Sequence, residues 1–195
     1  MLVIGLTGSI GMGKTTTAAM FRAHGLPVHD ADAAVHRLYR GDAVAPIEAA
    51  FPGVAQGGIV DRVRLAEIVA SDKEALARLE AIVHPMVRAS EATFLSAIRA
   101  MRHRLAFLDV PLLFETGAAA RVDAVVVVTA PPETQRARVL ARPGMTAERF
   151  DTLLRRQMPD SEKRQRAHFL IDTGSGIAAS ERQVDAVLRA LASAF

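Results

Sequence analysis

The sequence has no cysteine and no tryptophan among its 195 residues, and it has a single tyrosine. Without cysteine, the chain can form neither a disulfide framework nor a metal site made of thiolates. No apolar run approaches the roughly 20 residues that a membrane-spanning helix needs. No basic segment of a cleavable leader precedes the apolar run at residues 2–6. We therefore expect a soluble, cytoplasmic protein that does not bind membranes.

A phosphate-binding motif occupies residues 8–15. The run Gly8-Ser9-Ile10-Gly11-Met12-Gly13-Lys14-Thr15 fits the pattern G-x-x-x-x-G-K-[ST]. The apolar run before it is typical of a buried strand, and the residues after it can form a helix. The glycines let backbone N–H groups turn toward phosphate oxygens, and the helix N-terminus adds a favourable dipole. We predict that Lys14 reaches the β- and γ-phosphates of a nucleotide and that the Thr15 hydroxyl binds Mg²⁺.

Strand and helix patterns alternate along much of the chain. Apolar runs typical of buried parallel strands lie at residues 2–6, 27–29, 105–110, 124–129 and 169–171. Helical patterns cover residues 15–24, 33–39, 132–141, 147–158 and 178–194. This alternation predicts an α/β fold, with a five-stranded, mainly parallel sheet flanked by helices. Ligands of such sheets bind beyond the carboxyl ends of the strands, so we expect the residues that follow the strands to share one cleft.

Residues 41–104 interrupt the alternation and contain no convincing strand. Helical patterns cover residues 46–51, 62–70 and 72–102, with Ser71 and Asp72 as a capped start and Pro85 as a start or kink. We predict one domain over residues 1–195. Its nucleotide-binding core comprises residues 1–40, 105–141 and 161–195, its helical acceptor-binding insertion residues 41–104, and its lid residues 142–160.

Acidic side chains follow two of the predicted strands. Asp30 and Asp32 come after the second strand, and Asp109 ends the third. Phosphoryl transfer to an alcohol needs a carboxylate that accepts or orients the hydroxyl proton, and it needs oxygen ligands for Mg²⁺. We assign Asp32 to this chemistry, as base or metal ligand, and Asp30 to capping the next helix. Asp109 is predicted to hold Mg²⁺ through water.

An apolar ledge continues from the third strand through Pro111, Leu112 and Leu113 to Glu115. Such a ledge, which ends in an acid, could line the pocket of the phosphate acceptor. Glu115 is equally compatible with a solvated position at a helix start. His84 stands beside Pro85 in an otherwise apolar helical stretch, where a packed or capping role competes with ligand binding.

Arginines follow the fourth predicted strand. Arg142 precedes Pro143-Gly144, where the helix must break. A guanidinium beside a flexible segment can fold over a transferring phosphoryl group and compensate its charge. Arg138 is the second candidate for this role. An exposed position without function is the alternative for both.

The net charge of +3 is unevenly spread, because residues 136–166 hold nine lysines and arginines against four acidic residues. This basic block contains Phe150 but no tyrosine or tryptophan, so stacking platforms for bases are scarce. We therefore predict no nucleic-acid binding and interpret the block as the lid over a polyphosphate. A solvated helical face is the alternative.

Taken together, these motifs resemble the dephospho-coenzyme A kinase family over nearly the whole chain. The resemblance depends on the phosphate motif, Asp30-Ala31-Asp32, His84-Pro85 and Val110-Pro111-Leu112-Leu113-Phe114-Glu115. It continues through Ala130-Pro131-Pro132-Glu133-Thr134-Gln135, Arg138, Arg142, Gln157 and Ile171-Asp172-Thr173-Gly174. The phosphate motif alone is shared by many nucleotide-binding proteins, whereas the ordered set is specific.

The resemblance implies a P-loop kinase fold and ATP-dependent phosphorylation of the ribose 3′-hydroxyl of dephospho-coenzyme A, the final step of coenzyme A biosynthesis. It implies that Gly8 and residues 11–16 (Gly11, Met12, Gly13, Lys14, Thr15 and Thr16) cradle ATP, with Arg138 and Arg142 beside it. Lys14 and Arg142 would stabilise the moving phosphoryl group, and Asp32 would be the base. His84, Pro111, Leu112, Leu113 and Glu115 would bind the acceptor, and Thr15, Asp32 and Asp109 would hold Mg²⁺.

Two positions depart from the family pattern. Ser9 stands where the family often has glycine, and Thr173 stands where it commonly has asparagine after an Ile-Asp pair. Because of the second departure, we do not expect the side chain at that position to contact adenine as it would in the family.

Three other functions compete with this interpretation. A nucleoside monophosphate or shikimate-type kinase would share the sheet, the phosphate loop and the lid. A GTP-dependent switch protein would carry an Asn-Lys-x-Asp run, which this chain lacks. A nucleic-acid-binding protein would depend on the basic block alone. The sequence makes no prediction of oligomeric state.

Overall fold

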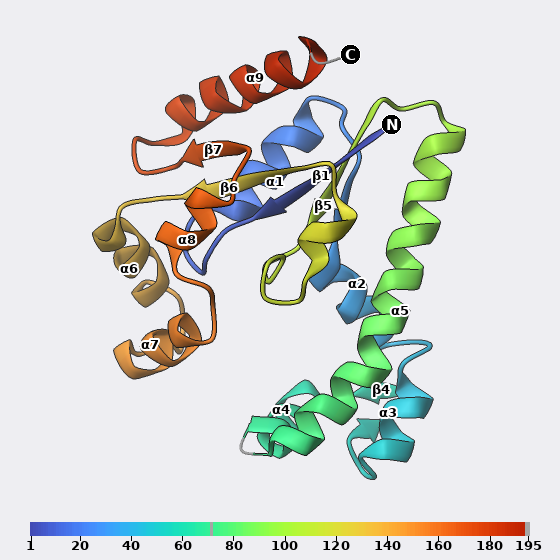
Figure 1. The fold of residues 1–195 in the computed structure, drawn as a ribbon. Coiled ribbons are helices and arrows are strands. Elements are labelled where there is room, and N and C mark those ends of the chain that lie inside the picture. Colours follow the sequence, from blue (N-terminus) through green and yellow to red (C-terminus); the bar gives the residue numbers. More distant parts are fainter. Residues whose placement is uncertain (71, 194–195) are drawn as a thin grey trace. The chain divides into compact units, whose positions relative to one another are not determined.

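A computed structural model describes residues 1–70 and 72–193 (Figure 1). Its main sheet has five strands in the order β2-β5-β1-β6-β7. The bounds of these strands are β1 Leu2–Thr7, β2 Val28–Asp30, β5 Leu105–Asp109, β6 Ala124–Thr129 and β7 Phe169–Asp172. Each lies within two residues of a predicted strand, so the predicted five-stranded sheet is confirmed.

The strand ladders bring the residues that follow the strands to one edge of the sheet. β1 pairs in parallel with β5 and with β6, and β6 pairs in parallel with β7. The register sets Leu6 opposite Asp109 and Thr129 opposite Asp172. Because parallel strands end at the same edge, the loop after β1, the carboxylate of Asp109 and the segment after β7 are neighbours there.

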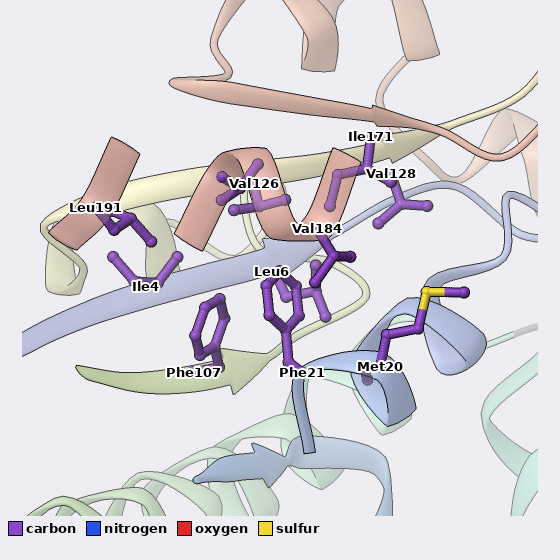
Figure 2. Packing of buried hydrophobic residues seen from close by; sticks show 12 residues of the cluster. Ile4, Leu6, Met20, Phe21, Phe107, Val126, Val128, Ile171, Val184 and Leu191 are labelled. Carbon is purple, nitrogen blue, oxygen red and sulfur yellow. The ribbon is translucent and has the colours of Figure 1, made fainter. Parts of the chain in front are cut away.

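One face of the sheet carries the larger core. Alternate residues of β6, Val126 and Val128, lie fully buried with Ile4 and Leu6 of β1 (Figure 2). Helices α1 (Lys14–Ala23) and α9 (Ile177–Ser193) cover this face through Phe21 and Val184, among others. The two-residue alternation of a strand sends Val125 and Val127 to the opposite face, where they pack with Leu113 and Ala118. Both faces are thus apolar, which explains the continuous valine run in β6.

The remaining helices have well-defined bounds. They are α2 Ala31–Leu38, α3 Val44–Ala50, α4 Arg62–Ala70, α5 Lys73–Ala100, the 3₁₀ helix η1 Ala118–Arg121, α6 Pro132–Leu140, α7 Ala147–Arg155 and α8 Asp160–Gln165. The chain forms two compact units, one of residues 1–29 with 98–195 and one of residues 30–97. The insertion predicted from the sequence covered residues 41–104, and its proposed role in acceptor binding stays a prediction.

The second unit contains a short hairpin that the sequence analysis did not predict. β3 (Ala55–Gln56) pairs antiparallel with β4 (Ile59–Val60). The expectation of no strand in this region was therefore wrong, because strands of two residues are too short to show an alternating pattern. Gly57 and Gly58, both with positive φ, supply the hairpin turn, and this glycine pair was the available signal. The carboxylate of Glu48 fixes the entry to the hairpin by accepting the N–H groups of Gly53 and Ala55.

Helix α5 begins and continues as the sequence pattern indicates. The Asp72 carboxylate caps it by accepting the N–H groups of Glu74 and Ala75 at 2.8 and 3.0 Å. Ser71, the other predicted capping residue, lies outside the described residues. Pro85 sits inside the helix, which continues to Ala100. The core of this unit forms where Leu79 and Val83 of α5 pack with Ile47, Phe51 and other apolar residues.

Candidate active site

The loop after β1 leads directly into an open helix N-terminus. Gly13 precedes α1 and has φ 90°, and no side chain caps the helix. The first turn of α1 holds no acidic residue. Since the first N–H groups of a helix have no partner within it, they are available to an anion. Thr15 and Thr16 are exposed in this turn. The local geometry is therefore that of a phosphate site.

Three side chains from distant parts of the sequence hold this loop in place. Gln135 Nε2 in α6 donates to the Ile10 carbonyl at 2.7 Å, and Gln157 Oε1 accepts the Ile10 N–H at 3.0 Å. Thr173 Oγ1 donates to the Met12 carbonyl at 2.8 Å. Backbone polar groups of a loop are thus satisfied by side chains, as a buried loop requires. These three side chains fix the conformation of the loop at Ile10 and Met12.

Two glycines of the loop allow its close packing. Gly11 has φ 80°, and a Cβ atom there would lie 2.5 Å from Cγ2 of Val139 in α6. A Cβ on Gly13 would lie 3.0 Å from the Thr173 hydroxyl oxygen. A side chain at either position would therefore both strain the backbone and displace a neighbour. Met12 between them is 2% exposed, so its side chain belongs to the core and not to the ligand-facing surface.

Lys14 and Asp109 form an ion pair in this structure. Lys14 Nζ lies 2.5 Å from Asp109 Oδ1, with the side chains 15% and 3% exposed. The β1–β5 ladder explains the meeting, because Asp109 ends β5 opposite Leu6, two residues before the loop. The two residues were predicted to act on the same phosphates, one directly and one through Mg²⁺. The structure brings them together.

Arg138 and Arg142 occupy different environments. Arg138 in α6 donates through Nη1 to Thr173 Oγ1 and through Nη2 to the Thr173 carbonyl, at 2.7 and 2.8 Å. Arg142 lies beyond the end of α6 and is exposed. It precedes Gly144, which has φ 72° and no atom near its missing Cβ. Arg138 therefore helps to fix Thr173, which in turn contacts the phosphate loop. Arg142, by contrast, is an exposed side chain beside the turn at Gly144.

Some residues of the Pro111–Glu115 ledge lie in the core and others on the surface. The Pro111 carbonyl accepts the hydroxyl of Thr7, the last residue of β1, at 3.0 Å. Leu113 is fully buried beneath the sheet, and Leu112 is 38% exposed. Glu115 Oε1 accepts the Met158 N–H at 2.8 Å and lies 2.9 Å from Lys163 Nζ. Leu112 is thus the exposed apolar side chain of the ledge, and the acceptor role of the ledge stays a prediction.

The expected capping role of Asp30 is confirmed. Asp30 Oδ1 accepts the Ala33 N–H at 2.9 Å and caps α2. Asp32, in the first turn of α2, is exposed, as is His84 on α5. Both residues belong to the second compact unit, and the structure does not determine their place relative to the phosphate loop. Their catalytic and acceptor roles stay predictions.

The donor set near the loop suits a hard cation. The Thr15 hydroxyl and the Asp109 carboxylate are oxygen ligands of the kind that Mg²⁺ prefers. Among residues 1–70 and 72–193, no three His, Cys, Asp or Glu side chains gather into a metal cluster. That finding is compatible with Mg²⁺, which is commonly held by one or two carboxylates together with substrate phosphates and waters.

Comparisons with known proteins agree with this arrangement. The family model described as dephospho-CoA kinase matches residues 2–179. A dephospho-CoA kinase of Mesorhizobium japonicum is 58% identical over 188 residues, which cover 96% of this chain and 95% of that protein. The chain belongs to the dephospho-CoA kinase family. The family predicted from the sequence motifs is thus confirmed.

Solved structures show the same fold. TT1252 from Thermus thermophilus is 40% identical, with a TM-score of 0.87 over 97% of both chains. A dephospho-CoA kinase from Campylobacter jejuni is 26% identical, with a TM-score of 0.72 over 96% of this chain and 95% of that one. The predicted P-loop kinase fold is therefore confirmed as that of a dephospho-CoA kinase family member.

Sequence reasoning overlooked one charged residue that contacts the Pro111–Glu115 ledge. Lys163, in α8, is fully buried against Glu115. It stands in the polar run Asp160-Ser161-Glu162-Lys163-Arg164-Gln165, which has no apolar periodicity to mark an inward position. Nothing in the sequence pattern distinguishes it from its exposed neighbours, and only the fold does.

Proposed function

We propose that this protein transfers the γ-phosphoryl group of ATP to the ribose 3′-hydroxyl of dephospho-coenzyme A, giving coenzyme A and ADP in the final step of coenzyme A biosynthesis. The observation that carries the proposal is the match to the dephospho-CoA kinase family over residues 2–179, which includes the whole phosphate loop. The pairing of Lys14 with Asp109 beside that loop supports the nucleotide half of the reaction.

The phosphate loop and Lys14 would bind the nucleotide. In the proposed reaction the N–H groups at the start of α1 hold the phosphates, and Lys14 leaves Asp109 to contact the β- and γ-phosphates. Thr15 and Asp109, with Asp32 as a further candidate, would hold Mg²⁺, and Asp109 would do so through water. When bound, the metal neutralises charge on the phosphate oxygens. These roles follow from oxygen chemistry and from position along the chain.

Asp32 is proposed to accept the proton of the acceptor hydroxyl. The 3′-oxygen then forms a bond to the γ-phosphorus, and the bond between that phosphorus and the bridging oxygen of ADP breaks. A general base of this kind contributes about 10²- to 10⁴-fold in rate. His84, Pro111, Leu112 and Glu115 are the proposed acceptor-side residues. Leu113, the other residue predicted there, is fully buried and would support the ledge from the core.

Arg142 is proposed to close over the reacting phosphoryl group with the lid segment, residues 142–160. Its exposed guanidinium follows α6 at a break marked by Pro143 and Gly144. A cation brought to the equatorial phosphoryl oxygens stabilises the charge that spreads there in the transition state. Closure would also exclude water and suppress hydrolysis of ATP.

The protein is proposed to work in the cytoplasm on a small-molecule acceptor, without nucleic acid or membrane. Within residues 1–70 and 72–193, no helix is long and apolar enough to cross a bilayer. Three of the nine basic side chains of residues 136–166 have separate protein partners: Arg136 contacts Asp151, Arg138 contacts Thr173 and Lys163 contacts Glu115. These three side chains are therefore engaged within the protein, which supports the proposal that the block does not serve as a nucleic-acid surface.

The decisive experiment measures Mg·ATP consumption by the purified protein with dephospho-coenzyme A, adenosine monophosphate, shikimate or no acceptor. We expect ADP release and coenzyme A formation with dephospho-coenzyme A alone. Turnover with adenosine monophosphate or shikimate instead would keep the nucleotide site but contradict the proposed acceptor. Absence of ATP binding would contradict both halves of the proposal.

A further inference from the structure

The most deeply buried charge among the described residues is the ammonium group of Lys163. Its side chain is 0% exposed, and Nζ lies 2.9 Å from Glu115 Oε1 and 3.5 Å from the Pro111 carbonyl oxygen. Removing a lysine from water carries a large free-energy cost, which its partners must offset. An apolar pair of similar volume commonly gives equal or greater stability. Stability alone therefore does not explain the ion pair.

Glu115 connects Lys163 to a second segment of backbone. The same carboxylate oxygen, Oε1, accepts the Met158 N–H at 2.8 Å. Met158 directly follows Gln157, whose side-chain oxygen accepts the Ile10 N–H in the phosphate loop. A chain of contacts thus leads from Lys163 through Glu115 and Met158 to Gln157 and Ile10. Each link is a hydrogen bond, an ion pair or one peptide unit.

Residues 157–163, here called the anchor segment, are held at a further point. Asp160 Oδ2 accepts the hydroxyl of Thr129, the last residue of β6, at 2.7 Å. The anchor segment therefore contacts the phosphate loop, the residues after β5 and the end of β6. It also follows directly on α7, the helix of the lid segment. Residues 157–160 are also the last residues of the predicted lid segment, so the place of the anchor segment sets where the lid ends.

We propose that Lys163 is a positioning residue of the nucleotide site: through Glu115 it fixes the anchor segment, so that Gln157 holds the phosphate loop in its binding shape before ATP arrives. Lys163 does not touch the nucleotide, because its side chain is fully buried. Its benefit is preorganisation, since a loop already shaped for its ligand loses less entropy on binding. This inference rests on the proposed nucleotide site but not on the identity of the acceptor.

The first test compares Lys163→Met with Arg164→Met, a matched loss of positive charge at the neighbouring exposed position. Hydrogen–deuterium exchange of peptides that cover residues 8–15 and the affinity for a fluorescent ATP analogue are measured. Lys163→Met is expected to speed hydrogen exchange in the loop. It should also weaken binding of the ATP analogue by about tenfold, the scale of a modest coupling free energy. Arg164→Met should change neither. Unchanged exchange and affinity in a folded Lys163→Met protein would overturn the proposal.

The second test is a double-mutant cycle with Gln157→Ala. Because Lys163 is proposed to act through Gln157, the two substitutions together should weaken ATP binding about as much as Gln157→Ala alone. Fully additive losses would show that Lys163 acts by another route and would overturn the proposal.

A third variant separates positioning from folding. Glu115→Leu combined with Lys163→Met replaces the buried ion pair by apolar side chains and should keep the chain folded. It removes the acceptor of the Met158 N–H, so faster loop exchange and weaker ATP binding are expected at unchanged melting temperature. ATP binding equal to wild type would overturn the proposal. Because binding and exchange need no acceptor, failure of the wild type to phosphorylate dephospho-coenzyme A would contradict the proposed function alone.

Discussion

At the scale of single residues, Thr173 carries more connections than its size suggests. Its hydroxyl donates to the Met12 carbonyl and accepts from Arg138, and its N–H donates to the Thr129 carbonyl. Thr173 is 6% exposed, so water does not replace these partners readily. Thr173 therefore joins the phosphate loop, α6 and the end of β6 at one point.

Replacing Thr173 by valine should test this connection, because valine keeps the shape and removes the hydroxyl. The Met12 carbonyl and one Arg138 nitrogen then lose a partner, so we expect a loss of about 1–3 kcal/mol in the free energy of unfolding. The KM for ATP should rise as well. Urea unfolding and steady-state kinetics would measure both, with Thr173→Ser as the control that keeps the hydroxyl. Equal behaviour of the two variants would contradict the role of the hydroxyl.

Asp32 and Asp30 provide a matched pair for the proposed base. Asp32→Asn should lower kcat by about 10²-fold or more while ATP affinity stays nearly unchanged, because asparagine cannot accept the hydroxyl proton. Asp30→Asn should have little effect, since asparagine caps helices as well as aspartate. Initial-rate kinetics with equilibrium ATP binding would measure the split. Near-normal turnover of Asp32→Asn would remove Asp32 from the mechanism.

Glu115 should give the protein an acid-sensitive contribution to stability. Partial burial by itself raises the pKa of Glu115, but the hydrogen bonds from Lys163 and the Met158 N–H outweigh it, so the pKa lies below its ordinary value of 4.5. The folded state thus favours the ionised form. This stabilisation is present above the ordinary pKa and is lost as the pH falls through the lower pKa of the folded chain.

Glu115→Gln should therefore be less stable than wild type near neutral pH and show a flatter loss of stability in the acid range. Urea unfolding between about pH 3 and pH 7 would measure the two profiles. The difference between wild type and variant should shrink as the pH falls below 4.5. A difference that stays constant with pH would show that the ion pair does not control this stability.

At the scale of elements, a short exposed connection joins α6 to α7, and α7 is packed against α6. Arg136 of α6 lies over the ring of Phe150 in α7, at 5.7 Å from its centroid, and 3.4 Å from Asp151. Phe150 is 3% exposed, so it anchors α7. Between the helices, Arg142 and Gly144 are exposed. If the lid closes as proposed, the backbone would bend at these few exposed residues beside Arg142.

Arg142→Ala should lower kcat by about 10²-fold, more than it weakens ATP binding, because its contact is proposed for the transition state. Arg189→Ala removes an exposed arginine of α9, outside the lid segment, and should leave both parameters close to wild type. Single-turnover kinetics with ATP titration would separate the two effects. A loss confined to ATP affinity would reassign Arg142 to binding of the ground state.

Element prediction from the sequence succeeded where patterns are long. The valine run of β6 and the alternation around it gave the five strands and the main helices to within a few residues. Helix α8 was not predicted, because its six polar residues carry no apolar stripe. The β3–β4 hairpin was missed for a related reason, because strands of two residues are too short to show an alternating hydrophobic pattern.

At the scale of the whole molecule, the two compact units divide the proposed functional residues between them. The phosphate loop, Asp109 and Arg142 belong to residues 1–29 and 98–195, whereas Asp32 and His84 belong to residues 30–97. Each unit has its own buried apolar cluster. A ligand that binds one unit should stabilise the folded molecule by its binding free energy. A melting experiment detects this stabilisation.

Mg·ATP at about 100 times its Kd should add about 2.7 kcal/mol of stability, which corresponds to about 5–10 °C in melting temperature for a chain of this size. Chelation of Mg²⁺ by EDTA should reduce the shift, since the metal shares the phosphate charge. Differential scanning fluorimetry with ATP, GTP and dephospho-coenzyme A would measure it. An equal shift with Mg·GTP would contradict a preference for ATP, and no shift with ATP would contradict the nucleotide site.

The sequence by itself determined the sheet, the phosphate loop and the family, because these depend on local patterns: a continuous apolar strand, glycines at fixed spacing and an ordered set of motifs. It also assigned the capping role of Asp30. Only the tertiary structure decided which distant side chains hold the loop. Gln135, Gln157 and Thr173 reach it from three segments, and the buried Lys163 meets Glu115 across 48 positions of sequence. Such contacts depend on how strands and helices pack in space, and a local sequence pattern does not predict that packing.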